Sequence, residues 1–442
     1  MMINVNEFKK KLITQALQGK LTEQLISDGT ALELINEIVK TKSTLKKKWS
    51  ILEVDNDNLP FAIPSSWTWC YLESISDSIG GKTNQIQANE VKEKGEIPVV
   101  SQGKKYIDGY TSFSSKVITD IPVILFGDHT KIVKYINFEF VVGADGTKLL
   151  KPICVDNKFF YYLITYASFT IFDLGYSRHY LLLKKCPLPL PPLEEQKRIV
   201  AKLDEIFAEL DKIDEQQTRL TTIQEKMETK ILKLAIQGKL VEQRPEEGTG
   251  EELFKLIQKE KQELIKEGKI KKEKPLPVIE EDEIPFEIPS TWKWVRLKSI
   301  CDSIYAGGDK PQDFVENKDS NHTIPVVANG VTNNGIIGYT SLLRSRENSI
   351  TVAGRGTIGF TVYRNYSFFP IVRLIVLEQN KFINPIFLST YFKVMQEKST
   401  GTSIPQLTVP MIIDRVIPLP PLEEQNRIVA KIKNLLPLCR SN

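Results

Sequence analysis

The segment LPLPPLEEQKRIVAK at residues 188–202 returns as IPLPPLEEQNRIVAK at residues 417–431, 229 positions further along the chain. The two copies are identical at 13 of 15 positions. Chance does not produce such agreement, so the chain contains an internal repeat and is built from two copies of one plan. The length of 442 residues agrees with this, because it suits two domains with connecting elements better than a single hydrophobic core.

The repeat extends upstream of this motif in both halves. LPFAIPSSWTWCYLESISDSIGG (59–81) matches IPFEIPSTWKWVRLKSICDSIYAGG (284–308), and IPVVSQGKKYIDGYTS (97–112) matches IPVVANGVTNNGIIGYTS (324–341). Each half therefore carries a domain of about 130 residues ahead of its Pro-Pro-Leu-Glu-Glu-Gln motif.

The composition inside each domain favours strands with a helix after them. Residues 122–143 and 349–377 form short β-branched and aromatic runs broken by Gly, Asn and Asp, which is typical of strands and turns. Apolar, helix-like segments follow at 158–172 and 381–395. We therefore predict α+β domains in which strands dominate.

A long helix is expected directly after the first copy of the motif. Apolar residues recur at every seventh position there, a pattern typical of a coiled-coil seam. These residues are Ile199, Ile206, Ile213, Leu220, Met227 and Leu234. Gln217 and Gln224 interrupt the seam, Glu194 and Glu195 suit its first turn, and Gly238 predicts its end. About 45 residues at 1.5 Å each would give a rod of roughly 65–70 Å.

The two ends of the chain are expected to supply the partner of this helix. LITQALQGKLTEQ (12–24) resembles ILKLAIQGKLVEQ (231–243), and the last copy of the motif repeats the beginning of the central helix. The predicted fold is thus α+β, with two homologous strand-rich domains separated by a long antiparallel coiled-coil helix pair in a pseudo-twofold arrangement. We place the split helix at 1–20 and 417–442, the central helical region at 188–240, and the two domains at 21–187 and 241–416.

Composition excludes several classes of protein. Fifty-nine Lys and Arg against 55 Asp and Glu give a net charge of +4, which permits nucleic-acid binding without indicating it. Five scattered cysteines without a C-x-x-C pair argue against a disulfide framework, and the three histidines lack partners at metal-ligand spacing, so we expect no bound metal. We recognise no signal peptide and no membrane-spanning run, and we expect a cytoplasmic protein.

The loops between the repeated anchors differ from one copy to the other, as SQGKKYID (101–108) differs from ANGVTNNGII (328–337). Duplicated frames that carry different loops suit two readers of two different targets. A coiled-coil scaffold whose domains bind other proteins remains the alternative.

Together, the motifs resemble the specificity (S) subunits of type I restriction-modification systems over essentially the whole chain. The resemblance rests on IPSSWTWCYL and IPSTWKWVRL at the start of the domains, the two PPLEEQ segments at their ends, and ALQGKL with AIQGKL. It implies two target recognition domains that each read half of a bipartite double-stranded DNA sequence, with helices that set the unread gap. It also implies that two methyltransferase subunits and motor-nuclease subunits are partners, and that these bind S-adenosylmethionine, ATP and Mg²⁺.

No catalytic role is expected for the chain itself, and no cofactor is expected on it. It contains neither the Asn/Asp-Pro-Pro-Tyr/Phe motif of an adenine methyltransferase nor the G-x-x-x-x-G-K-[ST] loop of a motor. The only Pro-Pro pairs are the two that precede Leu-Glu-Glu-Gln.

Base reading relies on side chains that form paired hydrogen bonds to base edges, above all Arg, Asn and Gln. The candidates for DNA binding are Lys104, Lys105, His129, Lys131, Arg178, His179, Asn333, Asn334, Arg344, Arg346, Arg355, Ser403 and Gln406. For each of them a solvated surface role is the alternative. The candidates for partner binding are Leu193, Ile199, Ile206, Ile213 and Leu220. We assign Trp67, Trp69, Trp292 and Trp294 to packing rather than to base stacking.

Overall fold

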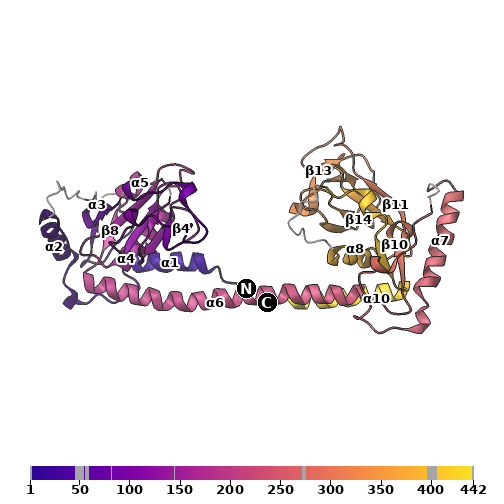
Figure 1. The fold of residues 1–442 in the computed structure, drawn as a ribbon, viewed down its shortest axis with the longest axis horizontal. Coiled ribbons are helices and arrows are strands. Elements are labelled where there is room, and N and C mark those ends of the chain that lie inside the picture. Colours follow the sequence, from indigo (N-terminus) through magenta and orange to yellow (C-terminus); the bar gives the residue numbers. More distant parts are fainter. Residues whose placement is uncertain are drawn as a thin grey trace. The chain divides into compact units, whose positions relative to one another are not determined.

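The computed structural model describes residues 2–44, 54, 59–80, 82–143, 145–270, 275–395 and 406–440 (Figure 1). The chain divides into two compact units, residues 1–218 and 219–442. The division falls inside helix α6 (Leu193–Ile236). The seven-residue repeat predicts this helix.

The first unit contains a four-stranded sheet in the order β2-β8-β5-β6, a three-stranded sheet in the order β4-β3-β7 and a two-stranded pair β1-β9. Strand β9 is the Leu-Pro-Leu of the repeated motif, and it pairs antiparallel with the strand that carries Trp69. The strands are β1 (Thr68–Cys70), β2 (Ser76–Ser78), β3 (Ile97–Val100), β4 (Gly109–Thr111), β5 (Val123–Gly127), β6 (Val133–Ile136), β7 (Val141–Val142), β8 (Thr147–Pro152) and β9 (Leu188–Leu190).

The second unit repeats this plan strand for strand. Its sheets run β11-β17-β14-β15, β13-β12-β16 and β10-β18, which is the order of the first unit with new numbers. The predicted duplication and the predicted α+β fold are therefore confirmed. The strands are β10 (Lys293–Arg296), β11 (Cys301–Ala306), β12 (Ile324–Val327), β13 (Ile336–Thr340), β14 (Ser349–Val352), β15 (Thr361–Arg364), β16 (Phe369–Pro370), β17 (Ile375–Gln379) and β18 (Val416–Leu419).

One helix packs on the four-stranded sheet of each unit, where the sequence predicted it. These helices are α4 (Asn157–Thr170) and α8 (Pro385–Val394). Each begins at a side-chain cap, Asp156 or Asn384, whose carboxylate or amide oxygen accepts backbone N–H groups of the first turn. Their apolar faces are buried because the sheet covers them.

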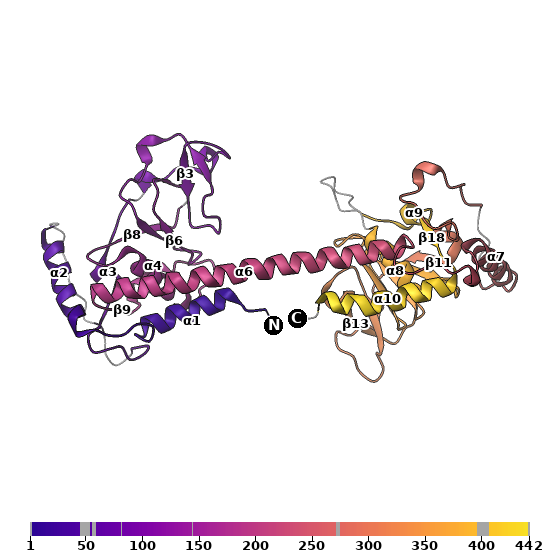
Figure 2. The same cartoon turned by 90° about the horizontal axis from the view of Figure 1, so that it is seen from below.

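The ends of the chain pack on α6, each within its own unit (Figures 1 and 2). Helix α1 (Val5–Leu17) lies along the first part of α6, where Gln217 accepts a hydrogen bond from the backbone N–H of Ile3 and donates one to its carbonyl. Helix α10 (Leu422–Arg440) lies along the last part, where Arg440 Nη2 donates to Glu228 Oε2 at 2.9 Å. Gln217 thus interrupts the apolar seam where it binds the segment before α1.

A second pair of repeated helices was not predicted. Helix α2 (Ala31–Thr44) and helix α7 (Gly250–Lys266) each follow the Gln-Gly-Lys-Leu segment after a single 3₁₀ turn. The buried ammonium of Lys42 donates to the carbonyls of Glu73 and Ser74 at 2.8 and 2.6 Å. Lys261 in the second unit donates in a similar way to the carbonyls of Lys298 and Cys301, both at 2.9 Å. The helices are therefore attached to their units through lysines. The remaining short helices are α3 (Leu72–Ile75), α5 (Tyr180–Lys185) and α9 (Val409–Ile412).

The Glu-Glu-Gln of the motif joins helix to sheet in the first unit. Glu195 is only 1% exposed, and its carboxylate accepts from the indole N–H of Trp67 at 2.7 Å and from Gln24 at 2.9 Å. Its neighbour Gln196 accepts from the backbone N–H of Asp156 at 2.9 Å, at the beginning of α4. The motif therefore connects α6 to β1 and α4.

The second copy of the motif makes the same connections. Glu424 accepts from the indole N–H of Trp292 at 2.9 Å and from Gln243 at 2.7 Å, and Gln425 accepts from the backbone N–H of Asn384 at 2.8 Å. Burial raises the pKa of the Glu424 carboxyl. The packing role predicted for the tryptophans is confirmed for Trp292 and its counterpart in the first unit, because both rings are buried and each indole N–H has an acceptor inside the fold.

Within the described ranges, no helix combines the length and the apolar content that crossing a bilayer would require.

Candidate nucleic-acid interface

Several loops of the first unit meet at one edge of its sheets, and Gln102 holds them together. Its amide oxygen accepts from the backbone N–H of His129 at 3.0 Å, and its amide nitrogen donates to the carbonyl of Asp145 at 2.7 Å. The hydroxyl of Thr130 donates to the carbonyl of Gln102 at 2.7 Å. One buried side chain therefore fixes the loops after β3 and β5 and the loop before β8.

A fourth loop joins this surface through His129. Its Nδ1 lies 3.2 Å from the carbonyl oxygen of Ser177, and its ring stacks on Tyr176 with centroids 4.9 Å apart. Lys131 forms an ion pair with Asp173 at 2.9 Å. We call this surface loop face 1. It consists of residues 101–106, 128–131, 145–146 and 172–178.

Loop face 1 brings most of the first unit's predicted DNA-binding residues together. Lys104, Lys105 and Arg178 are exposed on it. His179 is an exception, because it is fully buried. Its Nδ1 lies 3.0 Å from the carbonyl oxygen of Asp128, and its Nε2 accepts from a backbone N–H at 3.0 Å. The prediction that His179 contacts DNA is therefore wrong: both ring nitrogens serve the loop itself.

The second unit has an equivalent surface, held by Asn329. The amide oxygen of Asn329 accepts from the backbone N–H of Gly354 at 2.8 Å, and its amide nitrogen donates to the carbonyl of Val372 at 2.6 Å. Arg355 Nη2 donates to Gln406 Oε1 at 3.0 Å. We call this surface loop face 2. It consists of residues 328–335, 354–357, 372–373 and 406.

Sequence reasoning missed both of these amides, although a signal was present. Gln102 and Asn329 stand at the same position of the repeat, two residues after Ile-Pro-Val-Val. Because the flanking residues differ in kind, the sequence comparison places both amides in the variable loops. Each amide binds backbone atoms 25–43 residues away, and a single sequence does not reveal such bonds.

On loop face 2, Asn333 and Asn334 are exposed and both have left-handed backbone angles, with φ of 46° and 50°. Arg355 and Gln406 also lie there, whereas Ser403 lies outside the described residues. Arg344 is exposed and its guanidinium lies 5.8 Å from the ring centre of Phe369. All of these stay predictions for DNA contact.

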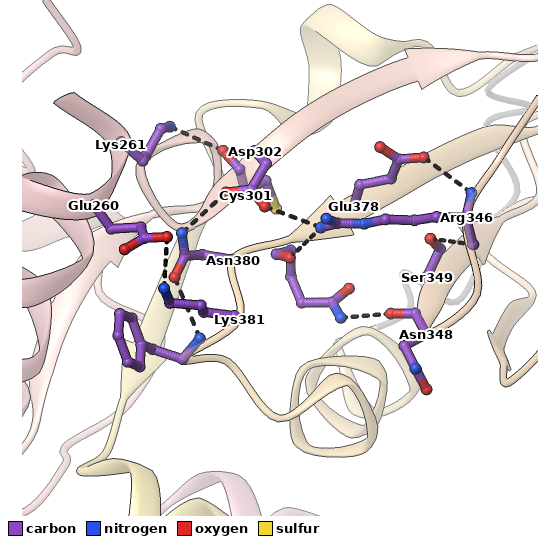
Figure 3. Close-up of polar contacts among 12 residues, drawn as sticks. Glu260, Lys261, Cys301, Asp302, Arg346, Asn348, Ser349, Glu378, Asn380 and Lys381 are labelled. Atoms are coloured by element: carbon purple, nitrogen blue, oxygen red, sulfur yellow. Dashed lines mark hydrogen bonds and ion pairs between the residues drawn. The ribbon is translucent and has the colours of Figure 1, made fainter. Parts of the chain in front are cut away.

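Arg346 lies at the opposite end of the sheet from loop face 2. It precedes β14, whereas loop face 2 follows that strand. Its Nη2 donates to Asp302 at 3.0 Å and to the carbonyl of Gln379 at 2.7 Å, at the beginning of β11 and the end of β17 (Figure 3). The hydroxyl of Ser349 donates to the carbonyl of Arg346 at 2.8 Å. The guanidinium therefore stabilises this edge of its own unit, away from residues 354–357 of loop face 2. Its side chain is still 50% exposed, and its contact with DNA stays a prediction.

The predicted partner-binding residues of α6 divide into two groups. Ile199 is fully buried in the core of the first unit, so its assignment to a partner is wrong. Leu193, Ile206 and Ile213 are partly buried against the same core. Leu220 is 39% exposed, and with Ile223 and Met227 it forms an apolar stretch of α6 that stays open.

Comparison with known proteins places this arrangement in one family. The family described as "Type I restriction modification DNA specificity domain" matches residues 64–222 and 289–439, which is one match per repeat and more than half of the chain. The chain belongs to the type I restriction-modification DNA specificity family. The matches begin near Trp67 and Trp292 and run into α6 and α10, so each spans the sheets, the loop face and the closing helix.

Relatives of this specificity family align over much or all of the chain. The EcoAI specificity subunit of a type I restriction enzyme from Escherichia coli is 26% identical over 98% of this chain and 89% of its own length. The EcoEI specificity subunit, also from Escherichia coli, is 27% identical over 69% of this chain and 63% of its own length. The chain is therefore a specificity subunit with two recognition domains, a subunit type that selects the target and performs no catalysis.

A solved structure supports the fold. A chain from the study entitled "Structural basis underlying complex assembly and conformational transition of the type I R-M system" superposes with a TM-score of 0.56. The match covers 86% of this chain and 93% of that chain at 17% identity, so it speaks for the fold alone.

Proposed function

We propose that the two loop faces read the two halves of a bipartite DNA target, one half-site each. The observation that carries this proposal is that Gln102 and Asn329 hold different loops on the same frame. A frame that is duplicated while its exposed residues change suits two reading surfaces with separate preferences. Base edges are read by such exposed Arg, Lys, Asn and Gln side chains, while contacts to phosphates fix the register.

The helices are proposed to set the gap and to dock partners. Helix α6 runs from one repeat into the next over 44 residues, about 66 Å at 1.5 Å per residue. Its exposed apolar stretch at Leu220, Ile223 and Met227 suits helices of methyltransferase subunits, of which two are expected. Motor-nuclease subunits would join this complex in the cytoplasm. S-adenosylmethionine, ATP and Mg²⁺ would then bind to these partners.

A domain exchange tests the proposal. The full-length chain is expressed with its methyltransferase in cells that lack other adenine methylation, and methylated sites are mapped by single-molecule sequencing. Residues 284–416 are then replaced by the equivalent domain of another specificity subunit. We expect a bipartite motif in which one half changes and the other half and the gap are retained.

The reciprocal exchange of residues 59–187 is the matched control, and it should change the other half only. An assembled complex whose methylation motif is the same before and after both exchanges would contradict the proposal. It would instead favour the scaffold whose domains bind proteins.

A further inference from the structure

Beneath each loop face lies a buried cation whose hydrogen-bond acceptors, among the residues that the structure describes, are all neutral. In the second unit this is Arg364 on β15, which is 2% exposed. Its Nε donates to the hydroxyl of Thr351 at 3.1 Å, its Nη1 to the hydroxyl of Tyr366 at 2.9 Å, and its Nη2 to the carbonyl of Asn334 at 2.6 Å. Two of these acceptors belong to the sheet region, and the third belongs to the exposed loop.

The first unit has a buried lysine on the equivalent strand, β6. Lys134 on β6 is 4% exposed, and its ammonium donates to the carbonyl of Ser101 at 2.7 Å and to the carbonyl of Lys105. Both acceptors lie in the loop that presents Lys104 and Lys105. Burial lowers the pKa of the Lys134 ammonium, and the nearby Asp108 carboxylate opposes this shift in part.

The two cations occupy equivalent strands but not equivalent positions. Strands β6 and β15 pair with β5 and β14, and the register places Arg364 opposite Ser349 and Ile136 opposite Val123. Lys134 therefore stands two residues before the counterpart of Arg364. Residues two apart on a strand share a face, so both side chains extend under the loop face.

This arrangement is costly for the fold. A buried cation that donates only to neutral acceptors loses its hydration without a direct ion pair, although the nearby Asp108 carboxylate compensates Lys134 in part. The loop adds further strain, because Asn333 and Asn334 are both left-handed and Gly335 follows with φ of 81°. A Cβ atom at Gly335 would lie 2.4 Å from the carbonyl oxygen of Ala328, so only glycine fits there.

The bond from Arg364 holds the backbone of this strained loop at the carbonyl of Asn334. Because Nη2 holds the carbonyl of Asn334 inward, the left-handed backbone leaves the amide side chains of Asn333 and Asn334 on the exposed side. The exposed tips of the two loops are unlike each other, but both are fastened through a main-chain carbonyl. The fastening is therefore independent of the side chains that the tip carries.

We infer that Arg364 and Lys134 are positioning residues for sequence reading: each sets the backbone of one recognition loop, and through it the bases accepted in one half-site. This inference rests on the proposed function. Neither side chain would touch DNA. The two residues control where Asn333, Asn334, Lys104 and Lys105 are presented.

The test uses the full-length chain in its complex with the methyltransferase, with methylation mapped as above. In Arg364→Met, which removes all donors, we expect methylation at sites with one wrong base in one half to rise about tenfold relative to the correct site. The base preference in the other half of the motif should be the same as in the wild type. Lys134→Met should relax the opposite half, and Lys134→Arg should restore it, because arginine can again donate to both carbonyls.

Tyr366→Phe is the matched control. It removes one acceptor of the same guanidinium but leaves the bond to the loop, so the motif should stay unchanged. Arg364→Gln is the second variant in case Arg364→Met does not assemble, because glutamine keeps a polar group in the strand but is too short to reach Asn334. If neither Arg364 variant forms a complex, the residue serves the folding of the whole domain and the inference is overturned.

A double variant separates this inference from the proposed function. Asn333→Gly with Asn334→Gly removes the tip side chains while keeping left-handed angles available. If it relaxes one half of the motif but Arg364→Met and Lys134→Met leave the motif intact, only the positioning role fails. If neither the glycine variant nor the domain exchange alters the motif, the proposed function itself fails.

Discussion

Glu195 and Glu424 are charged residues whose carboxylates are almost completely buried, and each accepts from a tryptophan and a glutamine. A buried carboxylate without hydrogen-bond donors lowers the stability of the fold, and buried donors without an acceptor do the same. The Glu-Glu-Gln of the repeated motif is therefore the same in both halves of the chain for a structural reason. Its second Glu and its Gln complete hydrogen bonds that join a helix to the rest of the unit.

We predict that Glu424→Ala lowers the free energy of unfolding of the second unit by about 3 kcal/mol, because the donors of Trp292 and Gln243 lose their acceptor. Glu424→Gln should cost less, since its amide oxygen still accepts from Trp292. Denaturant unfolding of the full chain measures both. Glu423→Ala changes the exposed neighbour and serves as the control. A loss in this control as large as in Glu424→Ala would contradict the prediction.

The pH dependence of this site has a definite sign. Burial raises the pKa of Glu424 above its ordinary value of 4.5, so the folded state binds a proton more readily than the unfolded state does. Stability from this group therefore increases as pH falls through the raised pKa toward 4.5. Relative to Glu424→Gln, the wild type should gain stability over that interval and show no further gain below it.

At the scale of elements, α2 and α7 are attached to their units by buried lysines that bind carbonyls at the end of a short helix. Burial lowers the pKa of Lys42 to about 7 from an ordinary value of 10.5. The unfolded state thus binds more protons than the folded state between these two values. Stability from Lys42 therefore rises with pH across this interval and is lowest below pH 7.

We predict that the free energy of unfolding of the wild type rises, relative to Lys42→Met, between pH 7 and pH 10. The methionine variant has no titrating group at position 42, and its other groups are shared with the wild type, so the difference between the two proteins isolates Lys42. Denaturant melts at several pH values give the measurement, and Lys40→Met, on an exposed position of the same helix, is the control. A difference that is constant across this range would refute the assignment.

The elements that sequence predicted and those it missed differ in how local their signals are. Helix α6 follows from a seven-residue repeat, and α4 and α8 follow from continuous apolar runs. Helices α2 and α7 were missed because their lysine attachments resemble ordinary surface charge. The prediction of an exposed His179 fails for a related reason. Its sequence neighbours are polar, but the ring is buried against the carbonyl of Asp128, 51 residues away. Contacts between distant segments leave little trace in a single sequence.

At the scale of the whole molecule, α6 is the one element that belongs to both units. Gln217 binds Ile3, just before α1, and Glu228 binds Arg440 of α10. Most residues of the helix between Gln217 and Glu228 are exposed. Changes of length at residues 218 and 219 fall at the boundary between the two units. Such changes therefore test the proposed spacing.

We predict that four helix-forming residues inserted between Thr218 and Arg219 widen the unread gap by one or two base pairs. They add about 6 Å and turn the helix by about 40°. Each base pair rises about 3.4 Å and turns about 35°, so the turn matches one base pair and the rise is nearer to two. Both half-site sequences should be unchanged when methylation is mapped.

A three-residue insertion at the same place is the control for phase. It turns the helix by about 300°, which no gap change of one or two base pairs matches, so methylation should be lost. Equal methylation by both insertions, with the original gap, would show that α6 does not set the spacing.

The two PPLEEQ segments also have a consequence for how the gene can change. Each stands where the last strand of a unit meets its closing helix, and each presents the same Glu and Gln to the same partners. A crossover between two such coding segments, from one gene or from two, joins a foreign domain to a resident helix with every buried hydrogen bond of the junction in place. A chain with a new recognition domain can therefore arise in one recombination step. No intermediate chain that fails to fold is needed.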